Sequence, residues 1–217
     1  GEKTYTVGIC QLVQHAALDA ATEGFKAALT EKLGDKAGAK EILENGFAAY
    51  PSSQAILVGL INYYQTSGEN PDQLFALLDK AKANEPNNAS LYYVEGDVYK
   101  KLGDIENAEK LFRKSTEIDP KYVYGILSVG ILYYDHAVEL QEKANAEMDD
   151  AKYTAYVNDM NAALKTAIEP FEESFKKSDD PEIKKAVAEY LKNIYFRFRT
   201  EDGMKDKYEF YDNFLKN

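Results

Sequence analysis

Apolar residues along most of this chain recur at three- and four-residue intervals, the spacing of a helix with one buried face. The clearest stretch predicts a helix over residues 90–101, a turn at Gly103-Asp104 and a second helix over Ile105–Ile118. Pro120 ends the second helix, because a proline ring clashes with the carbonyl group four residues earlier. The residues therefore predict one antiparallel helical hairpin.

This hairpin is one unit of a repeat. Pro51, Pro86 and Pro120 each close an amphipathic stretch, and the two intervals between them are nearly equal. The triplet Leu33-Gly34-Asp35 recurs as Leu102-Gly103-Asp104, at an offset equal to the sum of those two intervals. A period of about 34 residues is typical of stacked helical hairpins, in which each hairpin covers the apolar flank of the next.

Small and bulky residues are placed in the hairpin as close helix packing requires. Two small residues stand where the helices of one hairpin approach, and aromatic residues supply bulk between hairpins. The residues that carry this pattern are Tyr92, Gly96, Tyr99, Ala108, Phe112 and Pro120. Together they resemble the tetratricopeptide repeat family. The resemblance implies an all-α, right-handed superhelical solenoid of antiparallel helix pairs that acts as a non-catalytic protein-interaction module.

The later part of the chain keeps the repeat but lengthens one hairpin. Gly130 follows Gly96 by one period, and an insertion between residues 135 and 166 then precedes the second-helix signature Ala167, Phe171 and Ser174. Because this insertion holds no strong helix breaker, it predicts two extended helices that turn near residues 149–150 and project roughly 18 Å as a spur. Pro170 either kinks the return helix or opens a new first turn.

These patterns predict an N-terminal tail over residues 1–14 and a solenoid over residues 15–217. The predicted repeats are residues 20–53, 54–88, 89–122, 123–181 with the extended helices, and 182–217 as a capping pair. The capping pair consists of helices over residues 181–199 and 205–215, and it resembles the solvating end cap of a repeat array.

The N-terminal segment carries a different pattern. Tyr5, Val7 and Ile9 alternate with polar or small residues as in a strand, and a helical pattern follows over residues 15–33. The segment resembles the first strand and helix of the substrate-binding proteins of amino-acid-type ABC transporters. Since no further alternating strands and helices follow, ligand binding does not carry over. The chain is then either a chimera of such a fragment with a repeat protein, or the likeness is accidental.

An unpaired apolar strand recruits another strand edge. The tail is therefore expected to pair with a copy of itself, to lie in a solenoid groove, or to join a longer first helix. Self-association through the tail is one of the expected interactions.

The composition limits the classes of molecule that we expect this protein to bind. A formal net charge of −11 disfavours nucleic acid and anionic lipid, which are bound through Lys and Arg. The longest apolar run, residues 55–61, is too short to cross a bilayer, so we expect a soluble protein without membrane insertion. One cysteine, Cys10, does not identify the compartment, and only family resemblance favours the periplasm over the cytoplasm. The extended hairpin resembles repeat proteins of Bacteroidetes-like bacteria. The expected partner is a protein or peptide.

Catalytic and metal-binding patterns are sparse. His136, Glu139 and Glu142 share a predicted helix face and could touch a metal, but a solvated acidic face is the simpler interpretation. Residues 195–199 interleave aromatic rings with cations, as single-strand nucleic-acid binders do, yet core packing with arginines at a helix end explains them better. We expect no enzyme activity, no cofactor and no metal.

The remaining candidate site is the concave face, lined by the first helix of each repeat. Register with the family places partner-binding positions at Asn62, Gln65, Thr66, Tyr93, Asp97, Lys100, Lys101, Leu127, Ile131 and Tyr134. Aromatic and polar side chains together suit an extended peptide, because the rings bury area while the polar groups bind its backbone. The alternative is that Tyr93, Leu127 and Tyr134 only pack between helices. Two further hypotheses are a small-molecule-binding transport accessory and an engineered chimera without native function.

Overall fold

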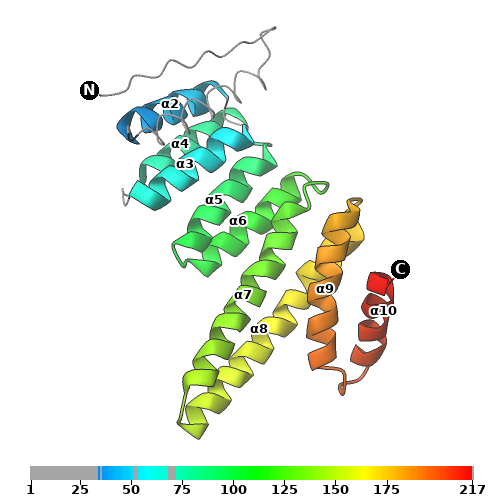
Figure 1. Cartoon of the computed structure of the whole chain (residues 1–217). Coiled ribbons are helices and arrows are strands. Elements are labelled where there is room, and N and C mark those ends of the chain that lie inside the picture. Colours follow the sequence, from blue (N-terminus) through cyan, green and yellow to red (C-terminus); the bar gives the residue numbers. More distant parts are fainter. Residues whose placement is uncertain (1–33, 35, 51–52, 68–71, 217) are drawn as a thin grey trace, which may run out of the picture. The chain divides into compact units, whose positions relative to one another are not determined.

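The structure of the chain is a computed structural model that describes residues 34, 36–50, 53–67 and 72–216 (Figure 1). These residues form helices and turns and contain no strand, so the all-α prediction is confirmed. The strand pattern, the helix over residues 15–33 and the self-association of the tail all concern residues 1–33, which lie outside the described part. The chain divides into two compact units, Gly1–Val94 and Glu95–Asn217.

Within its described residues, the first unit holds three helices and the start of a fourth. They are α2 (Lys36–Ala49), α3 (Gln54–Ser67), α4 (Asp72–Asn84) and the first half of α5 (Ala89–Lys101). At Gly59 an added Cβ would lie only 2.6 Å from Leu43 Cδ2, so the glycine lets α2 and α3 approach closely. The Tyr64 hydroxyl lies 3.0 Å from Glu44 Oε1 and 3.2 Å from Gln73 Oε1, which links α3 to both α2 and α4.

The second unit continues the chain of helices. After α5 come α6 (Ile105–Ile118), α7 (Tyr124–Ala146), α8 (Asp150–Lys177), α9 (Pro181–Arg197) and α10 (Met204–Lys216). Each of these helices packs on the next one along the chain, from α6 to α10. This sequential packing is what stacked hairpins require.

Aspartates fix where three of the helices begin. Asp104 Oδ1 accepts a hydrogen bond of 3.1 Å from the backbone N–H of Asn107, and Asp149 and Asp180 cap α8 and α9 in the same manner. Gly103 and Gly34 both have positive φ, 78° and 91°, a conformation that favours glycine. The two glycines lie two repeat periods apart and share this backbone conformation, as the recurring triplet predicts for equivalent turns.

Close approach within the hairpins follows the predicted small residues. A Cβ at Gly96 would lie 2.8 Å from the ring of Phe112, and a Cβ at Gly130 would lie 2.6 Å from the ring of Phe171. Both rings are fully buried. Phe171 therefore occupies in the α7–α8 hairpin the place that Phe112 has in α5–α6, and the signature beyond the insertion is confirmed.

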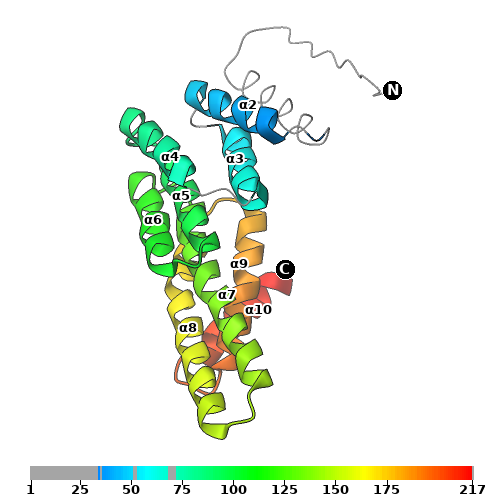
Figure 2. The same ribbon diagram turned by 90° about the vertical axis from the view of Figure 1, so that its left-hand side faces the viewer.

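The insertion lengthens both helices of one hairpin. α7 has 23 residues and α8 has 28, against 13 in α5 and 14 in α6. Their distal ends extend past α6 and α9 as the predicted spur (Figures 1 and 2). α8 continues through Pro170, so no new helix begins there.

A carboxylate shared by three donors holds the last helix. Glu172 of α8 accepts hydrogen bonds from the Tyr195 hydroxyl of α9 at 2.8 Å and from Lys207 Nζ of α10 at 2.7 Å, and the Tyr211 hydroxyl lies 3.5 Å away. Burial alone would raise the pKa of Glu172, but the hydrogen bonds from Lys207 and Tyr195 outweigh it and lower the pKa. α8, α9 and α10 are thereby tied together at one point.

Candidate functional site

In the second unit, α5, α7 and α9 contribute side chains to one continuous face. Lys100 Nζ lies 2.8 Å from Asp135 Oδ2, which joins α5 to α7. The two residues are 35 positions apart, close to the repeat period. Their side chains are 30% and 52% exposed, so the ion pair contributes only about 0–1 kcal/mol to stability. Either group can therefore exchange its partner for a ligand at little cost.

Two tyrosines lie beside this ion pair. The ring centroids of Tyr134 in α7 and Tyr190 in α9 are 4.8 Å apart with an interplanar angle of 72°. Tyr190 also stacks on the buried ring of Phe171, at 4.8 Å and 8°, so both tyrosines rest on a fixed base. Within the described part of the chain, neither tyrosine hydroxyl has a hydrogen-bond partner.

The electrostatics keep the Tyr190 hydroxyl protonated. Burial raises the pKa of Tyr190, and the nearby Asp135 carboxylate raises it further, while the Lys100 ammonium opposes this change. At neutral pH the hydroxyl is thus both a donor and an acceptor.

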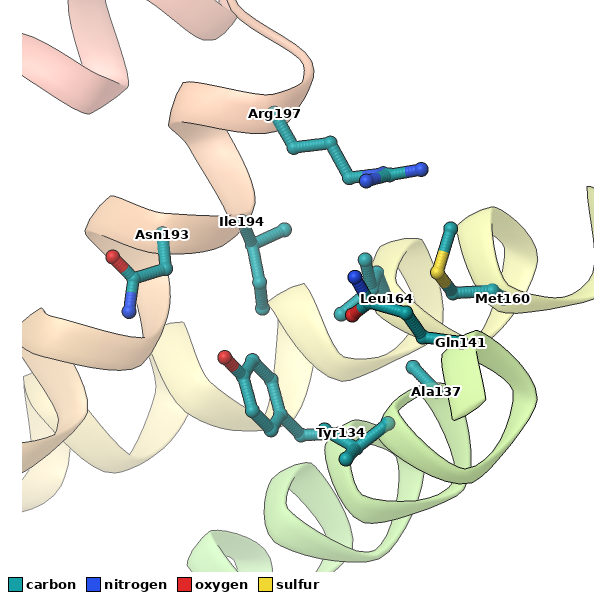
Figure 3. A pocket seen from close by; sticks show the side chains of 9 residues that line it. Tyr134, Ala137, Gln141, Met160, Leu164, Asn193, Ile194 and Arg197 are labelled. Atoms are coloured by element: carbon teal, nitrogen blue, oxygen red, sulfur yellow. The ribbon is translucent and has the colours of Figure 1, made fainter. Parts of the chain in front are cut away.

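A pocket of about 160 Å³ opens next to Tyr134, between α7, α8 and α9 (Figure 3). Apolar side chains form much of its wall, namely Ala137, Val138, Met160, Leu164 and Ile194. Its polar groups are the Tyr134 hydroxyl, the amides of Gln141 and Asn193, and the Arg197 guanidinium. A cavity of about this size accepts a benzene-sized group. We call the surface made by Lys100, Tyr134, Asp135, Tyr190, Asn193 and Arg197 the groove face.

The structure brings two of the predicted site residues, Lys100 and Tyr134, onto the groove face. Lys101 is paired instead with Asp97 one turn earlier in α5, at 2.6 Å. Leu127 and Ile131 are half-buried and pack against the core of α7 to α10.

The other predicted positions belong to the first unit. Asn62 is exposed and Tyr93 is half-buried. The side chains of Gln65 and Thr66 lie outside the described part of the structure.

Four residues of the groove face were not predicted from the sequence, namely Asp135, Tyr190, Asn193 and Arg197. Of these, Asp135 carried a usable signal, since it follows Lys100 by about one repeat.

The helix face considered for a metal, with His136, Glu139 and Glu142, lies on α7. His136 Nδ1 lies 4.0 Å from Glu139 Oε2, and its imidazole is partly exposed. Among the residues that the structure describes, no three His, Cys, Asp or Glu side chains gather closely enough to hold a metal ion. No helix within the described ranges is both long and apolar enough to cross a bilayer.

The hairpin α5–α6 matches a known family. The tetratricopeptide repeat model matches residues 89–122, the same hairpin in which the sequence pattern is clearest. No curated protein matches this sequence.

Solved structures extend the likeness over most of the chain. The human IFIT1 dimer with m7Gppp-AAAA is similar, with a TM-score of 0.55 at 18% identity over 92% of this chain and 41% of the IFIT1 chain. MamA gives a TM-score of 0.49 at 15% identity, covering 91% of this chain and 88% of its own. A tetratricopeptide repeat protein from Bacteroides fragilis gives 0.45 at 20% identity, covering 79% and 81%.

The chain spans less than half of the IFIT1 chain that it matches. The match of residues 89–122 and the likeness to IFIT1 confirm the tetratricopeptide-type helical-repeat fold. Folds of this type present extended surfaces for other molecules, which indicates an interaction or scaffold role.

Proposed function

We propose that the chain is a non-catalytic interaction module that binds an extended peptide of a partner protein along the groove face. The observation that carries the proposal is the placement of polar groups without internal partners around fixed aromatic rings. The hydroxyls of Tyr134 and Tyr190 and the Asn193 amide have no hydrogen-bond partner within the described residues, although they lie beside packed side chains. Such groups suit the backbone N–H and C=O of a bound peptide.

The groove face is also rigid. Tyr190 rests on Phe171, and Phe171 in turn contacts Gly130 of α7, so the rings are set before any partner arrives. A preorganised surface loses little conformational freedom on binding, and more of the contact energy appears as affinity. The remaining predicted positions are proposed as further partner contacts, each within its own unit, and they are Asn62, Gln65, Thr66, Tyr93, Asp97, Lys101, Leu127 and Ile131.

The test starts from peptides selected with the purified chain from a phage-displayed library. The affinity of the most enriched synthetic peptide is then measured by fluorescence anisotropy for Lys100→Ala and for Asn193→Ala. We expect each change to weaken binding roughly 5- to 30-fold, the effect of losing a contact of about 1–2 kcal/mol.

Lys114→Ala is the matched control. Lys114 on α6 is exposed and pairs with Glu117 at 3.1 Å, so its removal also breaks an exposed ion pair, but away from the groove face. The control should bind as the unchanged protein does. The proposal is wrong if no peptide is enriched, or if both groove variants bind like the control.

The other hypotheses rest on residues 1–33. A transport accessory predicts that aromatic amino acids raise the melting temperature, whereas the interaction module predicts no response. A chimera predicts that residues 1–35 and 36–217 match two unrelated parents. IFIT1 is seen with a capped RNA, but the net charge of −11 on this chain disfavours a polyanionic ligand. We therefore retain a protein or peptide as the partner.

A further inference from the structure

Cations gather at one place on this acidic protein. Where α9 ends, Arg199 Cζ lies 4.0 Å from the ring centroid of Phe196, and Lys165 Nζ of α8 lies 4.8 Å from that of Phe198. Arg197 lies in the last turn of α9, between Phe196 and Phe198 in the sequence. We call Lys165, Arg197, Arg199 and Phe196 the α9 corner.

Two of these cations keep donors available. Arg197 Nε donates to Asn161 Oδ1 at 2.7 Å, and Arg199 Nη1 donates to the Phe196 carbonyl at 2.7 Å. Each bond holds one guanidinium in place. The other N–H groups of Arg197 and Arg199 have no hydrogen-bond partner among the described residues. Lys165, in contrast, donates to both carboxylate oxygens of Glu201, at 2.9 and 2.8 Å. Against these three cations stands the Glu201 carboxylate, with Asp202 next to it in the turn.

The α9 corner adjoins the apolar pocket of the groove face. Arg197 lines the pocket of about 160 Å³, and it also lines an open depression of about 510 Å³ with Asn161, Phe196, Phe198, Arg199 and Glu201. Figure 3 shows the Arg197 side chain reaching from α9 toward α8 at the edge of the pocket. A partly apolar pocket and two positioned guanidiniums are therefore neighbours, connected by Arg197.

We propose that the α9 corner and the adjoining pocket bind an acidic peptide segment with one aliphatic side chain. The aliphatic group enters the pocket against Met160 and Ile194, and carboxylates beside it pair with Arg197 and Arg199. An arginine held by one bond presents its remaining N–H groups in a planar fork that fits a carboxylate. This inference rests on the proposed function and names the chemistry of the partner at one end of the same face.

The observations favour a peptide over a single-stranded nucleic acid. Nucleic-acid binders stack bases on open aromatic faces, but the Arg199 guanidinium already lies over the ring of Phe196. They also need a cationic track along the backbone, whereas only three cations gather in the α9 corner of a protein with a net charge of −11. A short acidic segment matches this small group of cations better than a long polyanion does.

The inference is tested with the full chain and the same displayed peptide library. The enriched peptides should contain an aliphatic residue flanked by two or more Asp or Glu. For the best synthetic peptide, Arg197→Glu should weaken binding at least about tenfold, since it replaces a charge-assisted pair with repulsion. Replacing the peptide's aliphatic residue by alanine should also weaken binding by about tenfold.

Lys110→Glu is the matched control, because Lys110 is exposed on α6 and undergoes the same change of charge. It should alter the affinity less than threefold by long-range repulsion alone, an effect of roughly 0.6 kcal/mol or less at physiological salt. Circular dichroism checks folding, and Arg199→Glu, in the turn after α9, is the second variant if Arg197→Glu unfolds.

Five results would overturn the inference. Enriched peptides without acidic residues would do so, as would an Arg197→Glu affinity equal to that of Lys110→Glu. If single-stranded oligothymidylate displaces the peptide and binds more tightly, the corner is a nucleic-acid site instead. When binding responds to Lys100→Ala but not to Arg197→Glu or Arg199→Glu, this inference fails while the proposed function stands. A library without any enriched peptide contradicts both.

Discussion

Replacing Gly125 by alanine tests whether α6 and α7 meet as closely as the hairpin stacking demands. A Cβ at Gly125 would lie 2.1 Å from Ser115 Oγ and 2.4 Å from the Phe112 carbonyl oxygen. The serine hydroxyl can rotate, although it would give up its 2.8 Å hydrogen bond to that carbonyl. The carbonyl belongs to the backbone of α6 and cannot rotate. Since ordinary C···O contacts are about 3.3–3.6 Å, α6 and α7 must separate by roughly 1 Å.

The size of the effect follows from two opposing contributions. Overpacking a buried contact costs about 1–3 kcal/mol. Alanine recovers up to about 1 kcal/mol, because it favours a helix more than glycine does. We expect Gly125→Ala to lower the free energy of unfolding by roughly 1–2 kcal/mol and the melting temperature by roughly 2–8 °C.

Urea denaturation followed by circular dichroism measures the change. Ala155→Gly, at an exposed position in α8, calibrates the helix-propensity contribution in the same chain. Adding Ser115→Ala to Gly125→Ala should restore only part of the stability, because the Phe112 carbonyl remains. A Gly125→Ala protein as stable as the original, or one fully restored by Ser115→Ala, would refute the close approach of these helices.

Two further predictions concern a helix cap and alkaline pH. Asp104→Ala removes the acceptor of the Asn107 N–H and should lower the free energy of unfolding in the same urea assay, with Asp104→Asn nearly neutral. Burial, together with the hydrogen bond to Glu109, raises the pKa of Tyr133 from 10.0 to about 12. The folded pKa is the higher one, so this stabilisation is complete below pH 10 and is lost as the pH rises toward 12. Tyr133→Phe should therefore show a smaller loss of stability across that range, and an unchanged pH profile would contradict the role of the hydroxyl.

Much of the fold is encoded in local signals that a single sequence displays. Gly103 and Asp104 mark the turn between α5 and α6, since one adopts positive φ and the other caps the next helix. The spur was predictable because residues 135–166 contain no breaker, so the two helices lengthen by default. The role of Gly130 followed from its spacing to Gly96.

The groove face was predictable only where the repeat could be counted. Lys100 lies in the hairpin with the clearest register, and its ion pair with Asp135 places it beside α7, while its role in partner binding stays a prediction. Tyr190 and Arg197 follow the insertion, which removes any fixed offset to the earlier repeats. Leu127 illustrates a different limit, because family register predicts it on the face and the structure shows it half-buried against the core of α7 to α10, so its role as a partner contact stays a prediction.

Hydrogen–deuterium exchange of the full chain, with and without the selected peptide, tests the groove face most directly. We expect the peptide to slow amide exchange at residues 131–141 of α7 and 190–197 of α9. The helix α10, over Met204–Lys216, should exchange at an unchanged rate. Slowed exchange confined to α10 and the adjoining part of α8, with α7 and α9 unaffected, would contradict binding at the groove face.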